Sequence, residues 1–112
     1  MNTLPPAPDR RRHRRQPVRG RVRVLCYKGV LDIGPNLAVS PLEVSELGIR
    51  LVLKVALDPG QEVCLGIEGH GQLKPMKRGG RVAWCTPAQG GTFHAGIELS
   101  ARLNHVELYK LT

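Results

Sequence analysis

Apolar and polar residues alternate over several short stretches of this chain, a pattern typical of half-buried β-strands. The clearest stretch covers residues 49–55, where the odd-numbered residues are apolar and Arg50 and Lys54 lie between them. Residues 61–67 follow after an Asp-Pro-Gly turn at residues 58–60, so these two stretches are predicted to pair as antiparallel neighbours. Four further strands are predicted at residues 21–26, 37–40, 81–85 and 92–99. The residues predicted to share an inward face are Val22, Val24 and Cys26 on the first of these strands, and Val63, Leu65 and Ile67 on the strand at residues 61–67.

Near the end of the chain the apolar spacing changes to three or four residues, which favours a short helix. Asn104 and Glu107 have the spacing of a capping box at its start. The buried face of this helix is expected to hold Leu103, Val106 and either Tyr109 or Lys110. Thirteen Gly and nine Pro argue against a helical bundle. About six short strands and one terminal helix fit a small antiparallel barrel.

Positive charge is concentrated near the start of the chain, and the rest of the chain is balanced. The 112 residues suffice for one ordinary domain, and the net charge of +8 is concentrated in residues 9–28, which hold nine Lys and Arg and one acidic residue. Residues 29–112 hold eight basic and eight acidic residues. We therefore predict a disordered lead-in over residues 1–9, a basic arginine arm over residues 10–20 and a barrel domain over residues 21–112.

Several other functions find little support in the sequence. The three cysteines lack C-x-x-C spacing and do not pair with the four histidines, so we expect no metal or cofactor and favour a reduced, cytoplasmic compartment. No apolar run approaches the roughly 20 residues that span a bilayer, and no export signal is recognisable. Ser45 has no His and Asp partners in a triad pattern, so no enzyme activity is expected. Trp84 and Phe93 are interpreted as core residues.

The arginine arm carries the first candidate binding residues. Guanidinium groups four residues apart can share one side of a single turn and grip a phosphate through paired donors, which makes Arg11 and Arg15 a candidate clamp. Pro17 favours an extended Gln16, so such a turn ends before the first strand. The same spacing occurs in two further pairs, Arg10 with Arg14 and Arg15 with Arg19. A solvated basic tail is the alternative to a clamp.

A second pattern lies directly before the clearest predicted strand. Glu43, Ser45 and Gly48 place a carboxylate, a hydroxyl and a glycine at close spacing. Together with the arm, this pattern resembles the PilZ family, whose members join an arginine-x-x-x-arginine segment to a downstream aspartate-or-asparagine, x, serine, x, x, glycine motif. The first motif reads Arg11 to Arg15 here, and the second reads Glu43 to Gly48. The resemblance covers nearly the whole chain from Arg11 onwards.

This resemblance implies an all-β fold, a six-stranded antiparallel, Greek-key, split β-barrel with a short C-terminal α-helix. It also implies a signalling receptor or adaptor whose arm clamps the bacterial messenger cyclic di-GMP against the barrel. In that role Arg11 and Arg15 would grip phosphates and guanine, and Arg12 would stack on a base or add charge. Ser45 would hydrogen-bond a guanine edge, and Gly48 would let the ligand or the arm approach the backbone.

Glu43 departs from the family pattern, which has Asp or Asn at this position. The extra methylene would displace a carboxylate that accepts a guanine N–H, unless a shift of the loop partly compensates. This departure favours an alternative, a PilZ-fold protein-interaction module that binds no ligand. A nucleic-acid-binding domain is a weaker alternative, because the charge outside the arm is balanced and aromatic residues are scarce. A downstream protein partner is expected for the receptor, and membrane insertion is not.

Overall fold

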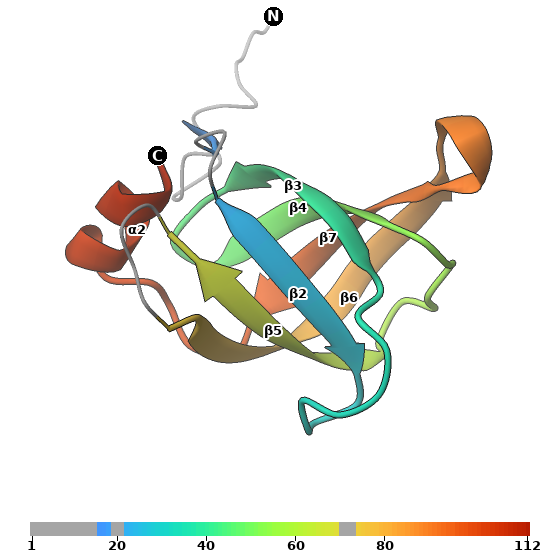
Figure 1. Ribbon diagram of the computed structural model, residues 1–112, viewed down its shortest axis with the longest axis horizontal. Helices are drawn as coiled ribbons and strands as arrows, with labels where there is room; N and C mark the ends of the chain where they lie inside the picture. Colours follow the sequence, from blue (N-terminus) through green and yellow to red (C-terminus); the bar gives the residue numbers. More distant parts are fainter. Residues whose placement is uncertain (1–15, 19–21, 70–73) are drawn as a thin grey trace, which may run out of the picture.

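The computed structural model describes residues 16–18, 22–69 and 74–112, and these form a β-sheet with a short helix at the C-terminal end (Figure 1). The strands are β1 (Gln16–Pro17), β2 (Arg23–Lys28), β3 (Ala38–Val44), β4 (Gly48–Leu53), β5 (Glu62–Glu68), β6 (Met76–Pro87) and β7 (Phe93–Leu99). A single 3₁₀ turn, η1 (Gln89–Gly91), joins β6 to β7, and the terminal helix is α2 (His105–Leu111). The lead-in at residues 1–9 and most of the predicted arm lie outside the described residues.

All strands belong to one antiparallel sheet in the order β1-β3-β4-β7-β6-β5-β2. The sheet curls into a half-barrel, so that β2 approaches the segment leading into β3 (Figure 1). Two hydrogen bonds join them: the Leu37 N–H donates to the Cys26 carbonyl at 2.8 Å, and the Cys26 N–H donates to Asn36 Oδ1 at 2.8 Å. The predicted all-β, antiparallel class with a C-terminal helix is confirmed.

The predicted number of six strands is wrong, because the described residues form seven. The additional strand is β1, which lies within the range assigned to the arm. It forms because Pro17 fixes its own backbone and keeps Gln16 extended. A proline without an N–H is tolerated at the edge of a sheet, where β1 adds to β3.

The predicted pairing of the strand at residues 49–55 with the strand at residues 61–67 is also wrong. In the structure β4 lies between β3 and β7, whereas β5 lies between β2 and β6. The turn at residues 58–60 does reverse the chain, but its bonds lead to β6: the Gly60 N–H donates to the Val82 carbonyl at 2.7 Å. The Val82 N–H in turn donates to the Gln61 carbonyl at 2.9 Å, so the chain leaves β4 and joins the other half of the sheet.

Two local predictions also need correction. The strand predicted at residues 37–40 is longer in the structure: β3 continues through Pro41 to Val44, because Pro41 lies next to a register irregularity of the β3–β4 pair that tolerates a missing N–H. The strand predicted at residues 81–85 is also longer: β6 begins at Met76, and Gly79 and Gly80 pair with β5 inside it.

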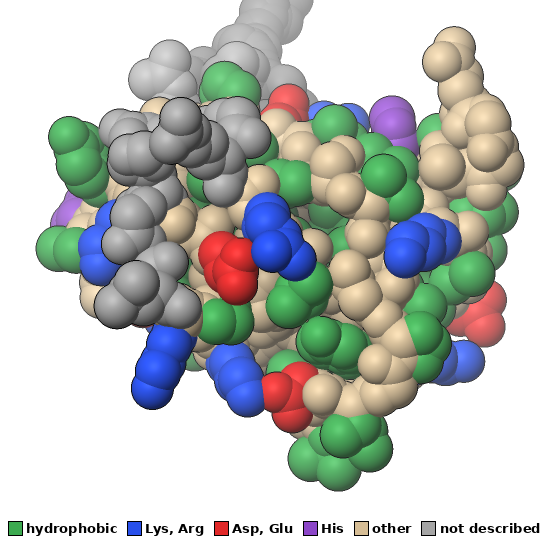
Figure 2. All heavy atoms as spheres, in the orientation of Figure 1, with side chains coloured by type: hydrophobic (Ala, Val, Ile, Leu, Met, Phe, Trp, Pro, Cys, Tyr) green, Lys and Arg blue, Asp and Glu red, His purple; other side chains and the backbone are tan. Residues whose placement is uncertain are grey.

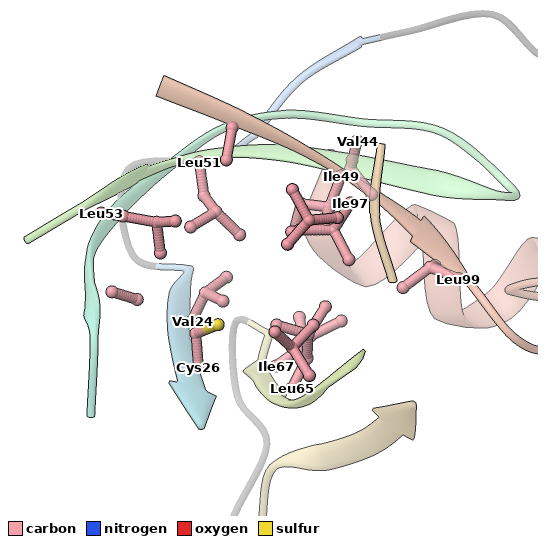
Figure 3. Close-up of a cluster of buried hydrophobic side chains, with 14 of the residues drawn as sticks. Val24, Cys26, Val44, Ile49, Leu51, Leu53, Leu65, Ile67, Ile97 and Leu99 are labelled. Atoms are coloured by element: carbon pink, nitrogen blue, oxygen red, sulfur yellow. The ribbon is translucent and has the colours of Figure 1, made fainter. Parts of the chain in front are cut away.

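The core fills the concave side of the curled sheet (Figure 3). The period-two reading is confirmed here, since the residues predicted to face inward on β2, β4 and β5 are buried. The largest fully buried side chains are Leu51, Leu53, Leu65, Ile67, Leu103, Leu111, Val44, Val63, Val82 and Cys26. Burial raises the pKa of the Cys26 thiol to about 12, and Cys64 contributes to the shift, so Cys26 is an inert core residue.

Helix α2 begins with the predicted capping box. The Glu107 N–H donates to Asn104 Oδ1 at 2.8 Å, and the Asn104 N–H donates to Glu107 Oε1 at 3.0 Å. Its predicted buried face is wrong, because Val106 and Tyr109 are exposed and Leu111 is the buried helical residue. Leu103 is buried as predicted but lies before the helix, and within α2 the residues Leu108 and Leu111 pack against the core in place of Val106 and Tyr109. Of the helices described, none has the length and apolar character needed to cross a membrane.

An exposed apolar loop occupies the end of the sheet opposite β1. Residues 29–37 connect β2 to β3, and Val30, Leu31 and Ile33 in this loop are all more than half exposed. Hydrophobic side chains gather at the lower edge of Figure 2, where Figure 1 places this loop. Lys77 on β6 forms an ion pair with Asp32, which ties the loop to the sheet. The full length of β3, about 20 Å, separates the loop from β1.

Candidate functional site

The second motif forms a tight corner between β3 and β4, which we call the β3–β4 corner (residues 43–48). The Ser45 N–H donates to the Gly48 carbonyl at 2.8 Å, and the Ser45 hydroxyl is 3.4 Å from the same oxygen. Ser45 is only 6% exposed, and it is the one buried polar side chain in the described part of the chain. The motif therefore builds a compact turn before any ligand is considered.

Gly48 has a packing role in this corner. A Cβ at this position would lie 3.2 Å from the Ile97 carbonyl oxygen of β7 and 3.8 Å from Ser45 Oγ. Glycine thus lets the corner fit closely against β7. The approach of the ligand or the arm to the Gly48 backbone stays a prediction.

The arm enters the described structure beside this corner. In the β1–β3 pair, Gln16 lies opposite Val44 and Pro17 lies opposite Glu43. Arg11, Arg12 and Arg15 themselves lie outside the described residues. The chain that follows them is nevertheless paired with the first two residues of the β3–β4 corner.

A line of laterally paired residues runs from β1 across the sheet. The pairs Pro17–Glu43, Glu43–Arg50, Arg50–Gly96 and Gly96–Trp84 join β1, β3, β4, β7 and β6 in turn. We call these five residues the outer row, because the neighbouring positions on β4 and β7 point into the core. The row links the place where the arm enters to the only tryptophan of the chain.

Arg50 lies at the centre of the outer row. Its Nη1 donates to Glu43 Oε1 at 3.1 Å, and its guanidinium carbon lies 5.5 Å from the centroid of the Trp84 ring. The Arg50 Nε is buried and has no hydrogen-bond partner among the described residues. Arg50 and Glu43 remain 31% and 36% exposed, so the pair is accessible from solvent.

Gly96 allows Trp84 to lie across β7. A Cβ on Gly96 would lie only 2.3 Å from Trp84 Nε1, so the ring occupies the space where another residue would have a side chain. Trp84 was expected in the core, but it is half-buried on the outer face, beneath Arg50. Phe93 is likewise half-buried and packs against the core.

Comparison with known families decides what kind of domain carries this arrangement. The family model for the PilZ domain matches residues 9–109, a span that includes both the arginine arm and the β3–β4 corner. The chain belongs to the PilZ family. No curated protein matches the chain. The PilZ family is a family of cyclic di-GMP-binding receptor modules.

Sequence reasoning missed the outer row of this PilZ domain. The alternation around Arg50 indicated that its side chain faces outward, but nothing local indicated Glu43 or Trp84 as its neighbours. The signal that could have found Glu43 is its charge, opposite to that of Arg50 and separated from it by one tight turn.

Other features of the described PilZ domain offer no competing site. No three His, Cys, Asp or Glu side chains of residues 16–18, 22–69 and 74–112 are grouped so as to hold a metal. An open depression lies beside β6 and β7, but an exposed ion pair between Arg81 and Glu98 at 3.3 Å lines it. The β3–β4 corner and the outer row are therefore the candidate site.

Proposed function

We propose that this PilZ domain is a cyclic di-GMP receptor whose arginine arm closes over the β3–β4 corner and the outer row. The observation that supports this most is the β1–β3 register, with Gln16 opposite Val44. It brings the residue that follows Arg15 beside the second motif, although 27 positions separate Gln16 from Glu43 in the sequence. Two motifs that are distant along the chain can then act on one ligand.

The chemistry of the ligand suits these residues. Cyclic di-GMP carries two phosphate charges between two guanines, and arginine binds phosphate oxygens or guanine O6 and N7 through paired donors. We assign Arg11 and Arg15 to phosphate and guanine, and Arg12 to stacking or added charge. We further propose that β1 extends by one residue when ligand binds, which would bring Arg15 opposite Ser45, the next position after the Gln16–Val44 pair.

The residues of the corner complete the proposed site. Glu43 accepts a guanine N–H, and Ser45 hydrogen-bonds the guanine edge beside it. Gly48 keeps the backbone open to the ligand or the arm. No metal or other cofactor is part of this proposal, and the ligand itself is cyclic di-GMP.

Signalling follows from ordering of the arm. Residues 9–28 carry nine cationic side chains and one acidic residue, so two ligand phosphates relieve charge repulsion there when they bind. Ordering the arm changes the surface beside β3, and we propose that a downstream cytoplasmic protein recognises that surface.

Calorimetric titration with cyclic di-GMP tests the proposal. Replacing Arg15→Ala removes charged hydrogen bonds to the ligand and should weaken binding about 30-fold, or ~2 kcal/mol. Lys77→Ala is the control, since it also removes one positive charge but does so beside the apolar loop. Equal dissociation constants for wild type and Arg15→Ala would rule out the assigned role of the arm.

The ion pair between Glu43 and Arg50 also supports a second candidate, a PilZ-fold interaction module that binds no ligand. In that case wild type gives no heat with cyclic di-GMP, and binding appears only after Glu43→Asp. Competition with a random oligonucleotide tests the third possibility, a nucleic-acid-binding arm. Such an arm would prefer the longer polyanion, so the oligonucleotide would displace cyclic di-GMP.

A further inference from the structure

The side chain at position 43 is one methylene longer than the aspartate of the family motif. The motif does not show how this longer side chain would be held in position. A glutamate has one more rotatable bond than an aspartate, so it can point its carboxylate in more directions and loses more entropy when it is fixed. In this chain Glu43 is not left to rotate, because its direct cross-strand partner is Arg50.

We propose that Arg50 is a positioning residue for guanine recognition, holding Glu43 by one carboxylate oxygen and leaving the other oxygen to accept a guanine N–H. This inference rests on the proposed function and deepens it, since it names the residue that makes the departure from the family motif workable. Nothing in the motif itself includes position 50.

The two carboxylate oxygens of Glu43 have different surroundings. Oε1 accepts from Arg50 Nη1 at 3.1 Å, whereas Oε2 accepts no hydrogen bond from any described residue. The Glu43 side chain is 36% exposed, so its carboxylate is accessible to a ligand. A carboxylate oxygen is an acceptor only, which suits guanine N1–H and N2–H donors and repels the N1 acceptor of adenine.

The position of the Arg50 guanidinium is in turn restricted by Trp84. The Trp84 ring, 5.5 Å away, holds the guanidinium by a cation–π contact, and Gly96 leaves the space in which that ring lies. The planar guanidinium therefore reaches Glu43 from a constrained position. This arrangement limits the freedom of the glutamate in the same way that a shorter side chain would.

The decisive measurement is the ratio of two affinities, for cyclic di-GMP and for cyclic di-AMP, which carry the same two phosphates. Loss of a positive charge at position 50 weakens binding of both compounds equally. Loss of Glu43 positioning weakens only the guanine compound. A lower ratio therefore reports positioning, and a merely structural or electrostatic role leaves the ratio unchanged.

For Arg50→Gln we expect cyclic di-GMP to bind about 10-fold more weakly, the scale of one charged hydrogen bond, and the affinity ratio to fall by about the same factor. Arg50→Lys keeps a cation within reach of Glu43 and should restore part of the ratio. The double variant Glu43→Gln, Arg50→Gln should have the same ratio as Glu43→Gln alone, because Arg50 acts through Glu43.

Arg81→Gln is the matched control, because Arg81 forms a cross-strand pair with Glu98 at 3.3 Å but lies outside the outer row. Its affinity ratio should equal that of wild type. Fluorescence of Trp84, the only tryptophan, checks that the ring stays folded against β7 in each variant.

The outcomes distinguish failure of the proposed receptor function from failure of the positioning role of Arg50. If wild type binds neither compound, the proposed function itself fails and this inference fails with it. If wild type prefers cyclic di-GMP and Arg50→Gln keeps the full preference, the receptor stands and the positioning role of Arg50 is overturned.

Discussion

Two arginines of this PilZ domain, Arg50 and Arg78, have similar surroundings but different partners. Each binds a glutamate, Glu43 for Arg50 and Glu107 for Arg78, and each has a buried Nε without a partner in the described part of the chain. The difference lies in the second carboxylate oxygen. Glu107 accepts from the Asn104 N–H with Oε1 and from Arg78 with Oε2, whereas Glu43 uses only Oε1.

The two glutamates therefore differ in how much of each carboxylate is hydrogen-bonded within the described part of the protein. Both oxygens of Glu107 are used within the protein, and the pair, 21% exposed on each side, fastens helix α2 to β6. Glu43 lies beside the entry of the arm, is more exposed, and keeps one oxygen for another donor. Variants on each side should therefore change different properties, stability for Arg78 and ligand affinity for Arg50.

The largest effect is expected from Gly96→Ala, which disturbs the support of Arg50. The new Cβ would lie 2.3 Å from Trp84 Nε1, so the ring must move and the sheet must adjust. Overpacking of this kind should cost about 2 kcal/mol of the free energy of unfolding, measured by urea denaturation, and should shift the Trp84 emission. Gly79→Ala is the control. Its new Cβ would contact only the Ser100 side chain, with Oγ at 3.3 Å, and would not touch Trp84. An unchanged emission in Gly96→Ala would contradict the placement of Trp84.

A smaller loss of stability is expected from Arg78→Met, which breaks the contact between β6 and α2. Removing a half-buried charged hydrogen bond should lower the free energy of unfolding by about 1.5 kcal/mol. The affinity for cyclic di-GMP should stay as in wild type, as calorimetry would show. A fall in affinity equal to that of Arg50→Gln would erase the distinction between the two arginines.

Arg50→Gln should change stability less than Arg78→Met does. Its ion pair is about one-third exposed, so water screens the lost charge, and the expected cost is below about 1 kcal/mol in urea denaturation. A stability loss exceeding that of Arg78→Met would show that Arg50 is mainly a structural residue.

The smallest expected effect is a pH dependence carried by Glu107. Hydrogen bonds from the Asn104 N–H and from Arg78 hold the pKa of Glu107 below its ordinary value. Because the folded pKa is the lower one, the stabilisation is fully present above the ordinary pKa and is lost as pH falls through the folded value. Urea denaturation of Glu107→Gln across acidic pH should show a weaker loss of stability toward low pH than wild type does, and an identical slope would contradict this assignment.

The sequence predicted the parts of the fold that depend on local pattern. Alternation is a local property, and it correctly placed Val24, Cys26 and Leu51 in the core. The capping box of Asn104 and Glu107 was equally accessible, because both residues lie within one helical turn.

Partner choice between strands could not be predicted in this way. The contact of Arg50 with Trp84 depends on β7 lying between β4 and β6, which no short stretch encodes. Strand β1 escaped prediction because two residues are too few to show a period. The roles of Arg11, Arg12 and Arg15 remain predictions, since these residues lie outside the described structure.

The most direct test of the central claim is heteronuclear NMR of the labelled chain during titration with cyclic di-GMP. If the arm and the β3–β4 corner form one site, the amides of Gln16, of residues 44–48 and the indole N–H of Trp84 should shift together with a single dissociation constant. Shifts confined to the arm, with the corner and Trp84 unchanged at saturating ligand, would contradict the account.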